Sequence, residues 1–263
     1  MGLRKKIKKL LYGYCPGFSG AFPYFGTKVY FPKGSELFNR VCIEGIYEHS
    51  SVCILTKLLK DNTTFIDVGA NIGLISIPVL KNNTSCRGIA FEPSPNTLPY
   101  LSRTAHESEL GHRWTIIGKA VGAELGELDF HLSSAEYGAY DGFKDTGRVP
   151  IEKMVKVPVT SIDLEWKTLY RPSISVIKID VEGAEASVLD GARECISICK
   201  PFIFLEWNLT NLSAYDSVPT YLMKFAESVD YAVYVAPHMI KINSDNELLL
   251  HMNFSENFLL CPN

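Results

Sequence analysis

Three common features are absent from this sequence: a long apolar run, paired cysteines and an excess of charge of one sign. Without about twenty consecutive apolar residues, no stretch is expected to span a membrane. A net charge of −3 over 263 residues argues against nucleic acid as a partner, which requires a basic surface. The seven cysteines are scattered without a Cys-x-x-Cys pair, which predicts a reduced, cytoplasmic protein without structural zinc.

The first eleven residues also lack two targeting signals. They have no clean apolar core of a signal peptide, and Lys6 breaks the myristoylation pattern. Leu3, Ile7, Leu10 and Leu11 fall at helical spacing opposite five basic residues. A helix lying on an anionic membrane has this pattern, which would make the protein peripheral to a membrane. An ordinary solvated first helix has it too, and we favour that interpretation.

Residues 64–73 combine a buried strand with a tight turn. The composition, 46% hydrophobic and 21% charged, is sufficient for one large α/β domain, and this stretch is its central element. Gly69 and Gly73 let the backbone approach a ligand, but Asn71 replaces the second glycine of a dinucleotide motif. Asp67 adds an acid at the strand end, which suits a cationic ligand without a pyrophosphate. S-adenosylmethionine is such a ligand.

The next two predicted strands extend this cofactor site. Residues 87–93 form a strand that ends in Glu92 and Pro93, 19 residues after Gly73. A carboxylate at this distance is typical of a group that binds the ribose hydroxyls. A third strand follows at residues 114–118, and we expect the turn containing Ala120 to flank the adenine. An ordinary strand–turn–helix with a structural Asp is the simpler alternative.

Residues 1–48 are predicted to form a lead-in that packs on the α/β domain of residues 49–263. The lead-in consists of a basic helix and of turns and a short hairpin rich in glycine, proline and aromatics within residues 12–35. Tyr47 and Glu48 stand close to the first core strand, so we expect both to reach the cofactor. A surface position for Glu48 is the alternative.

Alternating apolar and polar residues predict a hairpin inserted at residues 127–159. Its strands, residues 127–132 and 153–159, flank a polar connection at residues 133–150. A connection of this length is uncommon in a compact domain unless it is functional. It is therefore either a lid over the acceptor or a disordered insertion.

A second buried strand, residues 175–179, leads into the acids Asp180, Glu182 and Glu185. Open α/β sheets place their chemistry at this end of the strand. Acids in a first helical turn also complement the helix dipole, which is our interpretation of Glu185. A further strand ends in Glu206, and His238 follows a later strand on a loop that is expected to reach the cleft, although a lone loop histidine is more often incidental.

Together these segments resemble the FkbM family of S-adenosylmethionine-dependent methyltransferases. The resemblance rests on residues 67–73, 91–93 and 177–185, with residues 45–48 matching the lead-in. It implies an α/β, Rossmann-like class I methyltransferase fold: a seven-stranded, mostly parallel sheet with helices on both faces and a reversed last strand. It also implies O-methylation of a hydroxyl, typically on a sugar of a glycan, polysaccharide or glycolipid; a non-sugar natural product or lipid hydroxyl is the alternative.

For the reaction itself, the sequence offers two general bases. A hydroxyl acceptor must lose its proton as it attacks, and Asp180 is the first candidate base, with His238 as the second. Lys178 shares a strand face with Asp180 and could keep it ionised or bind the acceptor. A Mg²⁺ site built from Asp180, Glu206 and Asn208 is the metal-assisted alternative.

Two other classes of function remain open from the sequence. One is an oxidoreductase that binds a nicotinamide dinucleotide, against which Asn71 argues. The other is a catalytically inactive methyltransferase fold that serves as a binding module, against which Asp67, Glu92 and Asp180 argue.

Overall fold

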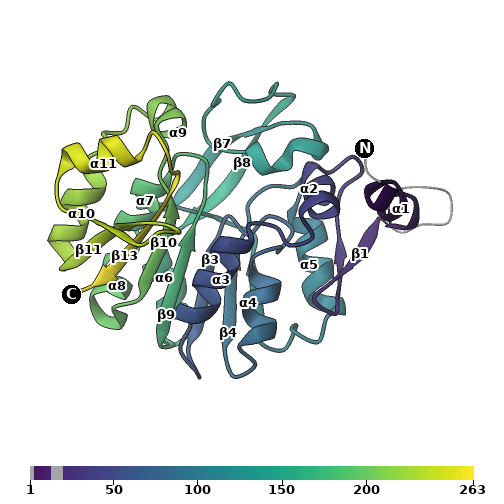
Figure 1. Cartoon of the computed structure of the whole chain (residues 1–263), viewed down its shortest axis with the longest axis horizontal. Helices are drawn as coiled ribbons and strands as arrows, with labels where there is room; N and C mark the ends of the chain where they lie inside the picture. Colours follow the sequence, from purple (N-terminus) through teal and green to yellow (C-terminus); the bar gives the residue numbers. More distant parts are fainter. Residues whose placement is uncertain (1–2, 13–19) are drawn as a thin grey trace.

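The computed structural model describes residues 3–12 and 20–263. Their central feature is an eight-stranded sheet with the strand order β12-β11-β13-β10-β9-β3-β4-β5 (Figure 1). Its strands are β3 (Thr64–Val68), β4 (Arg87–Phe91), β5 (Trp114–Ile117), β9 (Ile174–Ile179), β10 (Phe202–Glu206), β11 (Tyr231–Val235), β12 (Ile240–Ile242) and β13 (Asn257–Pro262). None of the described helices is long and apolar enough to cross a membrane.

The sheet confirms the predicted fold class. Strands β5, β4, β3, β9 and β10 run parallel to one another, whereas β13 runs antiparallel to both β10 and β11 and is the reversed last strand. The family resemblance implies seven strands, and the eighth is β12, a three-residue edge strand that pairs with β11. Such a short segment has too few residues for its alternation to stand out.

Helices cover both faces of the sheet because its strands are apolar on both sides. On β3, Ile66 and Val68 join one buried cluster, and Phe65 joins the other. The helices are α1 (Leu3–Tyr12), α2 (Glu36–Glu44), α3 (His49–Leu58), α4 (Ser76–Asn82), α5 (Leu98–Glu107), α6 (Ile162–Thr168), α7 (Glu185–Asp190), α8 (Arg193–Cys199), α9 (Leu209–Ala214), α10 (Tyr221–Val229) and α11 (Asp245–His251). Side chains of α6, α7, α8, α10 and α11 belong to the first cluster, and side chains of α2 to α5 to the second.

Two smaller sheets lie beside the main one. β1 (Ala21–Tyr24) and β2 (Thr27–Tyr30) form the predicted N-terminal hairpin; the part of that prediction at residues 13–19 lies outside the described residues. The other small sheet contains β6 (Ala120–Val121), β7 (Gly126–Leu132) and β8 (Lys153–Thr160), with β7 and β8 paired antiparallel as their alternation predicts. Between them, η1 (Ala135–Tyr140) is a short 3₁₀ helix.

Two helices differ from the prediction. The sequence predicts a helix from Leu74 to about Leu80, but α4 begins at Ser76, because the tight turn around Asn71 and Gly73 continues through Ile75. The sequence also predicts one helix from Ala184 to about Ser197, but the structure divides it into α7 and α8. Gly191 lies at the break, where a Cβ would stand 2.2 Å from the carbonyl oxygen of Gly122, so the chain bends around this close contact.

Candidate functional site

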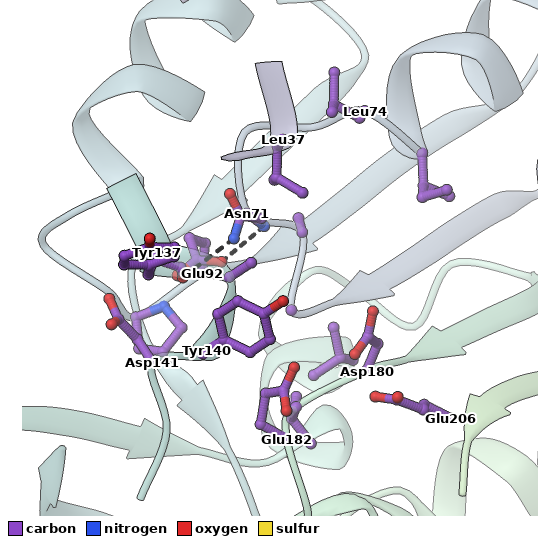
Figure 2. A pocket seen from close by; sticks show the side chains of 18 of the residues that line it. Leu37, Asn71, Leu74, Glu92, Tyr137, Tyr140, Asp141, Asp180, Glu182 and Glu206 are labelled. Atoms are coloured by element: carbon purple, nitrogen blue, oxygen red, sulfur yellow. Dashed lines mark hydrogen bonds between the residues drawn. The ribbon is translucent and has the colours of Figure 1, made fainter. Parts of the chain in front are cut away.

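A cavity of about 1020 Å³ opens at the carboxyl ends of β3, β4, β9 and β10. Helix α2 and the connection between β7 and β8 complete its walls. Small-molecule pockets usually enclose about 300–1,000 Å³, so the cavity has room for a cofactor together with an acceptor. Figure 2 shows side chains from these elements pointing into one space.

The turn after β3 brings backbone groups to the cavity. Gly69 has a φ of +77°, and a Cβ there would lie 1.8 Å from the carbonyl oxygen of Asp180. Only glycine therefore permits the ends of β3 and β9 to meet so closely. Asn71, with a φ of +51°, lines the cavity, and its side-chain amide donates to the carbonyl of Gly138 (3.3 Å). Gly73 does not line the cavity, because it packs against the ring of Trp114.

Glu92 joins this turn to the end of β4. One carboxylate oxygen accepts a hydrogen bond from the backbone N–H of Asn71 (2.7 Å), and the other accepts one from that of Ser94 (2.8 Å). Burial raises the pKa of Glu92 to about 7, against the lowering effect of these hydrogen bonds. Pro93 and Ala120 line the same side of the cavity, so the predicted ribose and adenine residues lie together.

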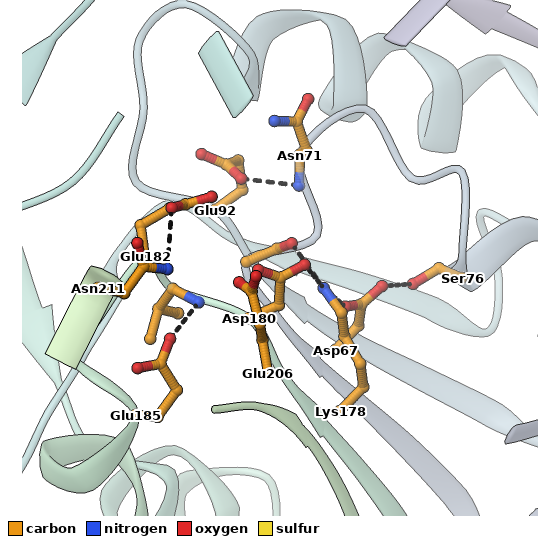
Figure 3. Close-up of polar contacts among 12 residues, drawn as sticks. Asp67, Asn71, Ser76, Glu92, Lys178, Asp180, Glu182, Glu185, Glu206 and Asn211 are labelled. Atoms are coloured by element: carbon orange, nitrogen blue, oxygen red, sulfur yellow. Dashed lines mark hydrogen bonds and ion pairs between the residues drawn. The ribbon is translucent and has the colours of Figure 1, made fainter. Parts of the chain in front are cut away.

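Asp67 has a different place from the predicted one. It is fully buried and does not line the cavity; Ser76 Oγ donates to its Oδ2 (2.6 Å), and the Lys178 ammonium lies 3.4 Å from its Oδ1 (Figure 3). The reason is register: Asp67 and Lys178 are paired residues of β3 and β9, so their side chains share a buried face. Asp67 thus anchors Lys178 and does not point toward a cofactor.

Lys178 connects three groups beneath the cavity. Its ammonium donates to the carbonyl oxygen of Gly69 (3.1 Å) and lies 3.2 Å from a carboxylate oxygen of Asp180, in addition to its contact with Asp67. Although burial lowers the pKa of Lys178, Asp180 and Asp67 raise it above its ordinary value. Lys178 therefore carries a fixed positive charge between the turn after β3 and the end of β9.

Asp180 presents its carboxylate to the cavity, where its side chain is 29% exposed. Burial alone would raise its pKa, but the charge of Lys178 and a hydrogen bond from Glu206 outweigh this effect and lower the pKa. Asp180 is therefore an anion at neutral pH. A proton acceptor with this exposure and charge can take a proton from a bound hydroxyl.

Three acids meet at this end of the sheet. One carboxylate oxygen from each of Asp180, Glu182 and Glu206 lies within 4.8 Å of the others. Burial and the charge of Asp180 raise the pKa of Glu206 to about 11 and that of Glu182 to about 8. Glu206 is thus protonated at neutral pH and donates its hydrogen bond to Asp180, while Arg148 Nη1 donates to Glu182 (2.9 Å).

Asn208 differs from its predicted role as a metal ligand. Its side-chain oxygen accepts the backbone N–H of Asn211 (2.8 Å) and caps α9, and its amide donates to Glu206 (2.9 Å). The oxygen that would bind a cation is already in use. Glu182 occupies the third oxygen position instead, and the sequence signal for it was the acidic turn that follows β9.

Tyr47 and Glu48 both line the cavity, at the start of α3. Burial, followed by the charges of Glu48 and Asp180, raises the pKa of Tyr47 well above its ordinary value. Burial and Asp180 also raise the pKa of Glu48. The Arg40 guanidinium lies 4.7 Å from the centre of the Tyr47 ring, so α2 and α3 supply a polar wall that faces Asp180.

The connection at residues 133–150 folds over the cavity as a strap. Asp141 fixes its base: one carboxylate oxygen accepts from Ser94 Oγ (2.6 Å) and the Asn96 amide (3.0 Å), and the other accepts from Ser133. Tyr137 and Tyr140 line the cavity (Figure 2). The sequence left this segment open as either a lid over the acceptor or a disordered insertion, because the residues that it contacts are distant along the chain.

His238 lies away from the cavity. It occupies an exposed turn between β11 and β12 and is not among the cavity residues. Two strands, β13 and β10, lie between β11 and β9 in the sheet, so the turn is displaced across the sheet from Asp180, which follows β9. We therefore do not retain His238 as a candidate base.

Comparison with known proteins agrees with this geometry. The FkbM methyltransferase domain matches residues 67–233, more than half of the chain. The hexuronic acid methyltransferase AglP of Haloferax volcanii is 25% identical over 149 residues, which cover 57% of this chain and 58% of that protein. The 2-O-methyltransferase NoeI of Sinorhizobium fredii is 23% identical over 167 residues, covering 59% of this chain and 67% of that protein.

A solved structure has the same fold. The FkbM methyltransferase of Methylobacillus flagellatus superposes with a TM-score of 0.51 at 18% identity, covering 82% of this chain and 48% of the other. The chain thus spans about half of that protein and little more than half of AglP. The domain match over residues 67–233 and the shared fold establish that this chain belongs to the FkbM methyltransferase family.

Proposed function

We propose that this protein transfers a methyl group from S-adenosylmethionine to a hydroxyl group of a sugar. The observation that carries the proposal is the Asp180 carboxylate, which Lys178 keeps ionised at the wall of a cavity large enough for both substrates. An ionised carboxylate suits a reaction in which the acceptor is a neutral hydroxyl.

In this proposal, some residues around the cavity bind the cofactor and others act on the acceptor. When bound, S-adenosylmethionine supplies an electrophilic methyl group. Glu92 and the backbone after β3 hold and orient its nucleoside, and Ala120 flanks the adenine. Asp180 would accept the proton of the acceptor hydroxyl, whose oxygen would take up the methyl group that the cofactor supplies, and the cofactor would leave as a neutral thioether. Tyr47 and Glu48 also line the cavity, and the charge of Asp180 acts on both of them.

A sugar acceptor is supported by the two curated relatives. One is named for a hexuronic acid and the other for methylation at a 2-O position. The cavity wall is rich in polar side chains of the kind that bind sugar hydroxyls, including Tyr47, Glu48 and Tyr140. We infer a glycan or glycolipid as the acceptor class.

Two measurements test the proposal. Calorimetric titration should show binding of S-adenosylhomocysteine but not of NAD, and Glu92→Ala should abolish that binding. With acceptor saccharides that gain one methyl group by mass spectrometry, Asp180→Asn should lower turnover by about 10²–10⁴-fold while affinity for S-adenosylhomocysteine stays within a few fold.

A matched control is Asp230→Asn, which changes an exposed aspartate at the end of α10 and should leave turnover unchanged. Unchanged turnover in Asp180→Asn would refute the assignment of the base. Binding of NAD instead of S-adenosylhomocysteine would refute the proposed activity.

The acid cluster favours a second, metal-assisted version of the reaction. Asp180, Glu182 and Glu206 offer three oxygens within 4.8 Å, and Mg²⁺ prefers oxygen ligands. These residues would hold the ion, which would orient the acceptor oxygen beside Asp180. EDTA inhibition that Mg²⁺ reverses would support this version; full activity in EDTA would exclude it and leave Asp180 as an unassisted base.

A further inference from the structure

The N-terminal helix α1 has an apolar face that the described residues around it leave about half exposed. Ile7, Leu10 and Leu11 stand at helical spacing and are 46%, 64% and 45% exposed. Three such side chains on one face are unusual on an otherwise solvated helix, where apolar residues normally face the core. Helix α1 packs against α2, so this arrangement leaves the apolar face directed away from the domain.

The charge on helix α1 has one sign. Five basic residues occupy positions 4 to 9, and no acidic residue precedes Glu36, although the chain as a whole carries −3. Of the lysines whose side chains are described, Lys6 is exposed, and Lys8 and Lys9 are half-buried. A concentration of positive charge beside exposed apolar side chains matches an anionic lipid surface, which offers phosphate groups above an apolar layer.

The position of α1 is also suited to docking. It lies at the end of the molecule opposite α10 and α11 (Figure 1), and its neighbour α2 contributes Glu36, Leu37 and Arg40 to the cavity wall. Ile43, 66% exposed on the same helix α2, adds apolar surface to this end of the molecule. The cationic, apolar surface therefore lies one helix away from the candidate active site.

We propose that α1 docks this protein on an anionic membrane surface, with Ile7, Leu10 and Leu11 inserted between lipids and the lysines contacting their phosphates. The proposal does not depend on the methyl-transfer reaction. A helix of 10 residues inserts only a small apolar area into the lipid, so the basic residues must supply much of the binding affinity. Binding must therefore weaken as the salt concentration increases.

The test is sedimentation of the full chain with lipid vesicles. The protein should bind phosphatidylcholine vesicles that contain phosphatidylglycerol and should not bind pure phosphatidylcholine. Each basic residue near an anionic surface contributes about fivefold to the partition coefficient. Changing Lys6, Lys8 and Lys9 together to Glu should therefore lower it by more than about a hundredfold, and Leu10→Ser with Leu11→Ser should also abolish binding.

A matched control makes the same charge change elsewhere. Lys57, Lys153 and Lys241 are exposed lysines outside α1, and their joint change to Glu should leave much more of the binding than the change in α1 does. Thermal unfolding shows that each variant is folded. Failure of the unchanged protein to bind anionic vesicles would overturn the proposal, as would equal losses in the two lysine variants. Concentration-dependent dimerisation that Leu10→Ser and Leu11→Ser abolish, without lipid binding, would assign the surface to a second copy instead.

Discussion

Lys178 is the residue on which the chemistry of the site most depends, although its side chain in the cavity wall is only 6% exposed. Its ammonium lies within 3.4 Å of Asp67, within 3.2 Å of Asp180 and within 3.1 Å of the Gly69 carbonyl. The two carboxylates offset the cost of burying the positive charge of Lys178. That charge in turn lowers the pKa of Asp180, the carboxylate that faces the cavity.

At this scale we predict the effect of Lys178→Met on the pH profile. Without the ammonium, burial and the neighbouring acids raise the pKa of Asp180. Because Asp180 must be ionised to act, the acidic limb of the turnover profile should move to higher pH, by one unit or more. The measurement is turnover against pH. Lys167→Met, which removes an exposed partner of Glu194, is the control and should leave the profile in place. A lower thermal stability of Lys178→Met with an unmoved limb would show a structural role only.

Among the segments of the molecule, the strap at residues 133–150 joins the most distant parts of the site. Asp141 attaches it to the connection after β4. The hydroxyl of Tyr215, at the end of α9, accepts the backbone N–H groups of Phe143 and Lys144. Arg148 contacts Glu182 after β9. The Phe143 ring also packs against Phe130 of β7, so opening the strap breaks this apolar contact and several hydrogen bonds while the sheet stays folded.

We therefore predict that Asp141→Ala loosens the strap selectively. The change removes four hydrogen-bond acceptor contacts, among them the one that satisfies the buried N–H of Ser133. Hydrogen exchange within residues 133–150 should accelerate at least tenfold, and KM for the acceptor should rise, with little change in β3 and β9. Asp145→Ala removes an exposed carboxylate from the same strap and is the control. Equal exchange rates in the two variants would contradict the attachment assigned to Asp141.

The sequence predicted the elements better than the contacts between them. Asn71, Glu92 and Asp180 all lie at the cavity, because each follows a strand whose carboxyl end faces it. The position of Asp67 depends on its pairing with Lys178 across β3 and β9, which are more than a hundred residues apart. The contacts of Arg148 and Asp141 likewise depend on how the strap folds back, and no local pattern encodes that.

At the scale of the whole molecule, buried acids make stability depend on pH. The pKa values of Glu92 and Glu185 are raised to about 7, that of Glu182 to about 8 and that of Glu206 to about 11, in each case chiefly by burial. From about pH 5 to 8 the folded state retains protons that the unfolded state has lost. Stability therefore falls as pH rises. Asp180 adds no slope in this window, because its lowered pKa leaves it ionised in both states.

Glu206→Gln tests this expectation. The amide can still donate to Asp180, but it needs no proton from solvent, so the variant should gain stability over the unchanged protein as pH rises from 5 to 8. The gain is at most about 1.4 kcal/mol per pH unit. Denaturant unfolding at both pH values measures it, and Glu227→Gln, an exposed site on α10, is the control. A pH-independent difference would show that Glu206 is ionised in the folded protein.

Because Lys178 contacts both Gly69 and Asp180, it also limits which substitutions this site can tolerate during evolution. One ammonium holds the turn after β3 through the Gly69 carbonyl and sets the charge of Asp180. A substitution at position 178 that changes the pKa of Asp180 therefore also disturbs the turn after β3, and no single compensating change at position 180 restores both. In a library that randomises positions 67, 178 and 180, active clones should retain all three residues or replace them as a set.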